Sequence, residues 1–280
     1  MFWKNTYNEL IKIAAKPRSY IGFGAITLVV GIILFALWMD GQEFISYFTK
    51  PFEQSITFEG KILNGNLITF VVLQMLIVHV PLLIALVTGD LVSGEAAMGT
   101  LRLMGTKPVS RTSILFSKYV AGAAYTLVML LWLMFIALVV GKMLFGTGDL
   151  LVLNSEGLVV FHQNDVFWRF ACGFGLAFLS MLMVATLSLT FSCFSDNSIG
   201  PIVSTMAVII LFTIISSLDI PVLESVRPYL FTNRMVAWRY FFEDPVPYKE
   251  ILNSSLILII HIVVLLSVSV YKFNKKDILS

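Results

Sequence analysis

The sequence predicts an all-α membrane protein, and three observations support this fold class. Of the 280 residues, 58% are hydrophobic and only 13% are charged, and the mean hydropathy is +0.89. Soluble domains carry about 25% charged residues, so most of this surface needs lipid as its solvent. Six stretches have the roughly 20 apolar residues that a membrane-spanning helix requires. These spans are expected at about 20–39, 67–88, 119–140, 170–194, 199–218 and 251–271, within a single transmembrane domain (1–280) that has no soluble domain.

Ahead of the first span, the N-terminal segment predicts an amphipathic interfacial helix. Its apolar residues recur at helical spacing and form one stripe, which consists of Trp3, Tyr7, Leu10 and Ile11. Lys12 and Lys16 fall on the opposite arc, and Pro17 ends the helix. Such a helix lies in the plane of the membrane interface, and its lysines are expected to face anionic lipid. The alternative is a disordered cytoplasmic leader.

The distribution of basic residues predicts that both termini lie in the cytoplasm. The N-terminal segment, the loop 89–118, the turn 195–198 and the C-terminal tail share one side of the membrane. They hold 11 of the 19 Lys and Arg residues but five of the 17 Asp and Glu residues. Short cytoplasmic loops are enriched in Lys and Arg. The first apolar run is too long for a cleaved signal peptide, so an uncleaved anchor in an inner or plasma membrane is expected.

The loop 89–118 is the largest element expected on the cytoplasmic side. Gly99 and Thr100 can start a short helix that ends before Pro108, and Ser110 is a plausible N-cap for the third span. The sequence thus predicts a short transverse helix between the second and third spans. An ordinary loop that contacts lipid headgroups fits the composition equally well.

The loop 219–250, on the opposite side, is rich in aromatic residues. Thr232 and Asn233 can cap a helix that runs to about Phe242, typical of an interfacial or re-entrant segment before the last span. The candidates for an outer gate are Tyr229, Phe231, Trp238 and Phe241. An aromatic belt with no transport role is the alternative. Between the third and fourth spans, residues 150–161 predict a β-hairpin.

No motif for catalysis or cofactor binding is present, and no catalytic, cofactor-binding or metal-ligating residue is expected. Neither Gly-Lys pair continues as a Walker A motif, because Lys61 is followed by Ile and Lys142 by Met. The spans contain no Asp, Glu, Lys or Arg, which disfavours an ion-driven carrier. His79 and His261 fall within spans, where an interhelical hydrogen bond is the more common role than a metal site. The net charge of +2 gives no indication of nucleic-acid binding.

The loop between the second and third spans carries a spaced pattern, E-x3-G-T-x2-L-x4-P-x2-R-x6-K. Its residues are Glu95, Gly99, Thr100, Leu103, Pro108, Arg111 and Lys118. This pattern resembles the first cytoplasmic loop of ABC-2 type transporter permeases. The layout is also similar to that family, with an amphipathic N-terminal helix, six spans, cytoplasmic termini and an outer helical segment before the last span.

The resemblance implies a function and a set of partners. The stretch 99–107, with Leu101 and Arg102, would be a coupling helix that docks on a separate ATPase subunit, where ATP is bound and hydrolysed. Two permease copies, or one copy and a homologous permease, would pair with two ATPase subunits and form an exporter. Glu95 and Arg111, at the cytoplasmic ends of the second and third spans, would pair or hold the loop geometry. The alternative is a non-transporting mechanotransmission or assembly module that acts on partners on the outer side.

Overall fold

The computed structural model describes residues 2–49, 61–76, 79–101, 109–154, 157–218 and 220–276, and it is nearly all helical. The helices of eight or more residues are α1 (Phe2–Ala15), α2 (Arg18–Thr49), α3 (Gly65–Leu76), α4 (Val80–Thr88), α5 (Asp90–Ala97), α7 (Arg111–Met134), α9 (Gln163–Phe194), α10 (Ile199–Ser217) and α13 (Tyr248–Lys275). The shorter elements are the π-helix η1 (Phe135–Val140), α8 (Gly141–Phe145), α11 (Pro221–Glu224), the 3-10 helices η2 (Arg227–Tyr229) and η3 (Ala237–Phe242), and α12 (Phe231–Met235).

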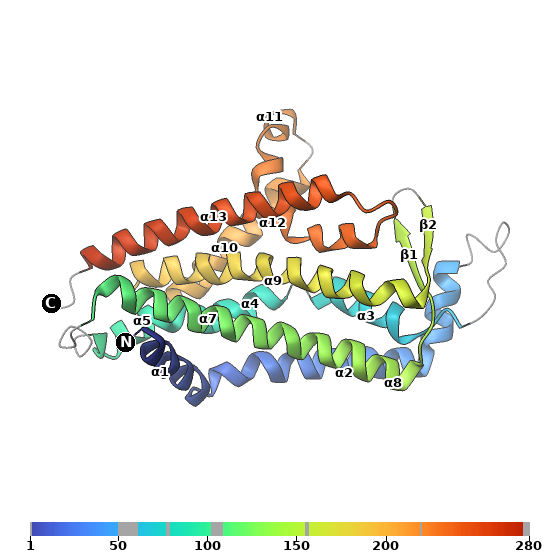
Figure 1. The fold of residues 1–280 in the computed structure, drawn as a ribbon, viewed down its shortest axis with the longest axis horizontal. Helices are drawn as coiled ribbons and strands as arrows, with labels where there is room; N and C mark the ends of the chain where they lie inside the picture. Colours follow the sequence, from blue (N-terminus) through green and yellow to red (C-terminus); the bar gives the residue numbers. More distant parts are fainter. Residues whose placement is uncertain are drawn as a thin grey trace.

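The helices form an elongated bundle with both chain termini at one end (Figure 1). The strands β1 (Leu150–Asn154) and β2 (Gly157–Phe161) lie at the other end. These two ends are called the termini end and the hairpin end below. Helix α9 runs through the middle of the bundle. Of its most apolar 18-residue stretch 67% is buried, compared with 17% for the corresponding stretch of α10. The core is therefore assembled around α9.

Five described helices are long and apolar enough to cross a membrane, and a sixth is added if the bent pair α4 and α5 counts as one span. The five are Arg18–Gly41, Arg111–Phe145, Gln163–Phe194, Ile199–Ser217 and Tyr248–Lys275. They coincide with the apolar stretches expected at 20–39, 119–140, 170–194, 199–218 and 251–271. The chain is a multi-pass membrane protein.

The expectation of one continuous helix over 67–88 is wrong. Helix α3 ends at Leu76, α4 begins at Val80, and α5 is bent by 41° relative to α4. Proline has no N–H to donate and restricts the residue before it, so it is favoured in the first turn of a helix. Pro81 occupies that place in α4, and His79, exposed at the N-cap, precedes a new helix rather than lying inside one.

The predicted hairpin is confirmed at the hairpin end. Strands β1 and β2 pair antiparallel, with Leu150 opposite Phe161 and Asn154 opposite Gly157. Arg169 of α9 joins the hairpin to the segment before the last span. Its guanidinium lies 4.1 Å from the Phe161 ring centroid and donates to the carbonyl oxygens of Phe241 (2.7 Å) and Glu243 (3.1 Å).

The helix expected over 232–242 is two shorter pieces, α12 and η3, which meet at Val236. Trp238 and Phe231 are almost completely buried. Trp238 packs edge-on against Phe70 of α3 and Phe242, and Phe231 packs against Phe212 of α10. Phe241 contacts Trp168, whereas Tyr229 is exposed. Three of the four outer-gate candidates therefore tie the segment to the bundle.

Candidate functional site

Helix α1 lies against the termini end, and the residues that it buries are Thr6, Glu9 and Ile13. Trp3, Tyr7 and Ile11 of the predicted stripe are exposed, Trp3 to 75%, while Leu10 packs partly against the core. Glu9 is buried, and it lies on the arc that was expected to face headgroups. The amphipathic helix is thus confirmed. Lys12 and Lys16, which were expected to face anionic lipid, bind carboxylates of the protein, while their side chains stay 46% and 32% exposed. Their contact with lipid stays a prediction.

Four charged side chains form a closed ring of ion pairs between α1, α5 and α7. Lys118 Nζ lies 2.8 Å from Glu9 Oε2 and 2.7 Å from Glu95 Oε2. Lys12 Nζ lies 2.6 Å from Glu9 Oε1 and 2.7 Å from Glu95 Oε1. Each carboxylate thus contacts both ammonium groups, and the two charges of each sign cancel. We refer to Glu9, Lys12, Glu95 and Lys118 as the ion-pair ring.

Burial sets the energetics of the ion-pair ring. The Lys118 side chain is 0% exposed and those of Glu9 and Glu95 are 8% exposed, whereas Lys12 stands at the edge. Burial opposes the charge of Lys12, but hydrogen bonds to Glu9 and Glu95 and their negative charges outweigh this effect and raise its pKa. A buried charge that loses its partner is strongly destabilising, so the four residues hold the three helices together only as a set.

A second cluster fixes the start of α5. The Asp90 carboxylate, nearly buried, lies 2.7 Å from Lys16 Nζ and 2.7 Å from Arg18 Nη1, which flank Pro17 between α1 and α2. On the opposite side, the hydroxyl of Ser192 in α9 accepts hydrogen bonds from the backbone N–H groups of Val92 (3.1 Å) and Ser93 (2.9 Å). Helix α5 is therefore held by α1, α2, α7 and α9.

Gly99 and Thr100 end α5 in a Schellman motif. The Thr100 N–H donates to the Glu95 carbonyl (3.0 Å), and the Gly99 N–H donates to the Ala96 carbonyl (3.0 Å). Gly99 has φ +68°, the left-handed conformation that this motif requires and that glycine adopts without strain. Glu95 thus has two structural roles. Its side chain belongs to the ion-pair ring, and its carbonyl accepts the capping hydrogen bond from Thr100.

The remaining residues of the spaced pattern have different positions. Arg111 does not contact Glu95, and its Nη1 donates to the carbonyl oxygens of Asn274 (2.9 Å) and Lys276 (2.8 Å) at the end of α13. Of the two alternatives expected for Glu95 and Arg111, the direct pair is wrong, because Lys118, two turns further along α7, reaches Glu95 instead. The other alternative, that the two residues hold the loop geometry, stays a prediction. Leu101 is buried. Arg102, Leu103 and Pro108 lie outside the described residues.

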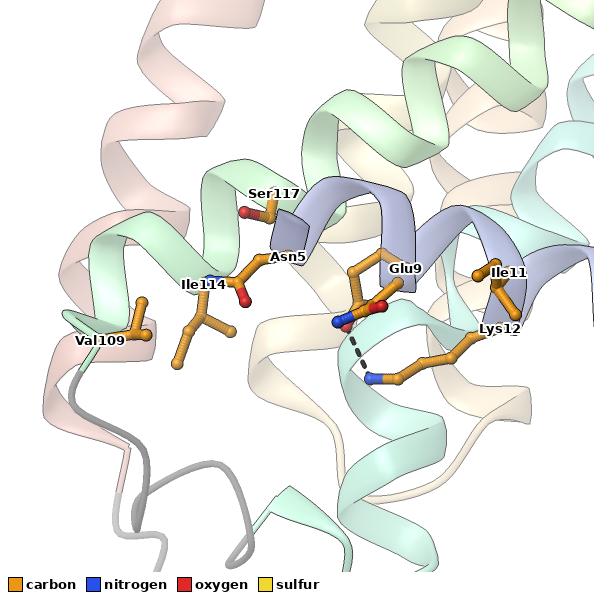
Figure 2. A pocket seen from close by; sticks show the side chains of 8 residues that line it. Asn5, Glu9, Ile11, Lys12, Val109, Ile114 and Ser117 are labelled. Carbon is orange, nitrogen blue, oxygen red and sulfur yellow. Dashed lines mark hydrogen bonds and ion pairs between the residues drawn. The ribbon is translucent and has the colours of Figure 1, made fainter. Parts of the chain in front are cut away.

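A cavity of about 260 Å³ opens beside the ion-pair ring (Figure 2). One wall is α1, with Asn5, Glu9 and Lys12, and the other is the start of α7. The α7 side is lined by Val109, Ile114 and Ser117. Ser110 caps this helix as predicted, since its hydroxyl accepts from the Ser113 N–H (3.3 Å). The cavity combines a charged wall with an apolar one.

Sequence reasoning missed Glu9, Lys12 and Asp90 as site residues. The signal for Glu9 and Lys12 was present, because an acidic residue three positions before a lysine on one helix face forms a pair. No signal in the sequence indicated that this pair turns toward the bundle. Asp90 was visible only as the acidic residue at the boundary of an apolar run.

A family model described as "Protein of unknown function (DUF2705)" matches residues 27–279. The chain belongs to this family. A stretch of 118 residues of this DUF2705 chain is 29% identical to "Uncharacterized protein YhcI" of Bacillus subtilis (strain 168). That match covers 40% of this chain and 37% of the YhcI sequence. Neither description states an activity, so a functional conclusion has to come from the site itself.

Proposed function

We propose that this protein is the permease subunit of an ATP-binding-cassette exporter of the ABC-2 type, driven by a separate ATPase subunit. In this proposal the chain has six spans, the second of them built from α3, α4 and α5. The protein lies in an inner or plasma membrane, and its termini end faces the cytoplasm. The spaced pattern from Glu95 to Lys118 and the excess of Lys and Arg at the termini end support this orientation.

The observation that carries the proposal is the ion-pair ring. Glu95 lies four residues before Gly99, Lys118 lies near the start of α7, and their carboxylate and ammonium groups are 2.7 Å apart. The two helices that flank the stretch 99–107 are thus joined at its base. A displacement of that stretch by a partner would move α5 and α7 together, because ion pairs among buried groups resist separation.

The surroundings of the ring fit a docking surface for the ATPase subunit. The cavity of about 260 Å³ lies between α1 and Val109, which follows the stretch 99–107 by two residues. It offers both charged and apolar contacts. Helix α1, with Trp3, Tyr7 and Ile11 exposed, would lie at the cytoplasmic membrane surface. At the hairpin end, Trp238, Phe231 and Phe241 would stabilise the outer segment, and Tyr229 stays available as a gate residue.

Co-purification tests this proposal. The tagged full-length chain, captured in mild detergent from the membranes of its own cells, is expected to bring down an ATPase subunit at about one copy per permease. Arg102→Glu and Leu103→Asp are expected to abolish this recovery while membrane insertion stays intact. Lys249→Glu, which reverses an exposed charge near the start of α13, is the matched control and should not change the recovery. Normal recovery with both loop variants would remove the assignment of the coupling stretch.

The reconstituted complex separates the two modes of action. Export predicts ATP hydrolysis in liposomes that rises with a transported substrate. A mechanical module predicts ATP hydrolysis that responds to an outer-side partner and to no small molecule. A purified chain that transports alone, without any nucleotide-hydrolysing partner, would overturn both versions.

A further inference from the structure

A second cavity, of about 500 Å³, lies on the side of the bundle near the hairpin end. Its walls come from one face of α7, η1 and α8 and from the start of α9. The residues that define it are Leu131, Phe135, Leu138, Val139, Lys142 and Phe167. We call this cavity the α7–α9 groove. The function proposed above makes no use of it.

The groove is apolar along its length and cationic at one end. The helical stretch from Leu131 to Lys142 is roughly 16 Å long, at 1.5 Å per residue. One leaflet of a bilayer hydrocarbon core, half of about 30 Å, has nearly the same depth. Lys142 lies three residues before the end of α8, and the described residues contain no acidic side chain in an ion pair with it. The groove thus has the dimensions of one acyl chain and the charge of one headgroup contact.

The opposite side of the same helix is fixed, which keeps the groove in place. The Thr69 hydroxyl of α3 donates to the Ala137 carbonyl inside the π-helix (2.9 Å), and the Gly65 N–H donates to the Gly146 carbonyl (2.9 Å). A Cβ atom at Gly65 would come within 2.5 Å of the Lys142 Cα, so the two backbones are in direct contact. Single-turn π segments within α-helices are frequent at functional sites.

We propose that the α7–α9 groove binds one anionic phospholipid of the surrounding bilayer. An acyl chain lies along Leu131, Phe135 and Val139, with Phe167 on the other wall. The phosphate lies against the Lys142 ammonium group at the membrane surface. A basic residue at the interface favours lipids of net negative charge over zwitterionic ones. This proposal concerns the chain in its membrane and stands whether or not an ATPase partner exists.

Native mass spectrometry of the purified full-length chain tests the proposal. The probe is an equimolar mixture of phosphatidylglycerol and phosphatidylcholine with the same acyl chains. Lys142→Gln is expected to lower the ratio of retained phosphatidylglycerol to phosphatidylcholine about fivefold, the factor for one interfacial charge. Lys142→Arg is expected to keep the ratio. Val139→Trp, at a half-exposed position, fills the groove. This variant is expected to abolish retention of the one phospholipid that stays bound to the purified wild-type chain.

The matched control is Lys249→Gln, which removes an exposed lysine near the start of α13 and should leave the ratio unchanged. Helical circular dichroism and gel-filtration elution verify the fold of each variant. The proposal is overturned if Lys142→Gln retains the wild-type ratio, or if Lys249→Gln lowers it equally. It is also overturned if Val139→Trp still holds the lipid, or if that variant changes the oligomeric state at constant lipid content, which would assign the groove to a second copy of the chain.

Discussion

Lys118 is the residue on which the termini end depends most. Its ammonium group is completely buried between Glu9 and Glu95. Lys118→Met leaves two buried carboxylates facing Lys12 alone, and breaking a buried ion pair from one side costs about 3–5 kcal/mol. We expect a loss of that size in the free energy of unfolding in detergent. Lys4→Met, at an exposed position on α1, is the control and should be within about 0.5 kcal/mol of wild type.

The same network sets how stability depends on pH. The pKa of Lys12 is raised above its ordinary value of 10.5 in the folded chain, because Glu9 and Glu95 stabilise its charge against the effect of burial. A group with a raised folded pKa contributes its full stabilisation below the unfolded pKa and loses it as the pH rises through the folded pKa. The stability difference between wild type and Lys12→Met is therefore expected to be constant from about pH 6 to 9 and to shrink only above about pH 10.5. A difference that already shrinks between pH 7 and 9 would contradict this assignment.

Single residues also mark the limit of prediction from sequence. The pattern that contains Glu95, Gly99 and Lys118 was visible, but the partners were not. Glu9 and Lys118 are 109 residues apart, and their contact exists only because α1 packs along α7. Arg111 is nearer to Glu95 in the sequence than Lys118 is, yet it lies beside the end of α13. Local propensity determines a helix, whereas such pairs depend on how helices pack.

At the scale of elements, the end of α5 offers a test that separates conformation from contact. A Cβ atom at Gly99 would meet nothing within 4 Å, so the effect of Gly99→Ala comes from its left-handed φ of +68° alone. This conformation costs an L-residue about 1–2 kcal/mol. Gly175 in α9 also has open space around it but is helical, so Gly175→Ala is expected to stabilise by about 0.5–1 kcal/mol. Chemical unfolding of both variants should show opposite signs, and equal signs would contradict the Schellman assignment.

The elements that were predicted well are those with a strong local signal. The long helices follow from apolar runs without charge, the hairpin at 150–161 from two β-rich strands around a turn, and the start of α7 from Ser110. The second span was predicted poorly because hydropathy averages across a break. Pro81 was the available signal, since a proline in the interior of an apolar run often begins a new helix. The segment 231–242 divided at Val236 because burial of Trp238 and Phe242 against α3 and α9 determines its path.

At the scale of the whole molecule, the proposed orientation predicts opposite accessibility of the two ends. In a background with Cys172→Ala and Cys193→Ala, Lys4→Cys lies at the termini end and Leu153→Cys on the exposed side of the hairpin. A membrane-impermeant maleimide added to intact cells should label Leu153→Cys and leave Lys4→Cys unlabelled until the membrane is permeabilised. The reverse order of labelling would place the ion-pair ring outside the cell and remove the basis of the proposed function.

Helix α1 combines a buried acidic residue, Glu9, with exposed aromatic residues, Trp3 and Tyr7. In the proposed orientation this helix would lie at the boundary between water and lipid, with Trp3 and Tyr7 among the headgroups. Because Glu9 and Lys12 attach α1 to α5 and α7, the depth of α1 in the membrane interface would also set the depth of those two helices. A change in the thickness or lateral pressure of the bilayer would therefore reach the stretch after Gly99 without any ligand.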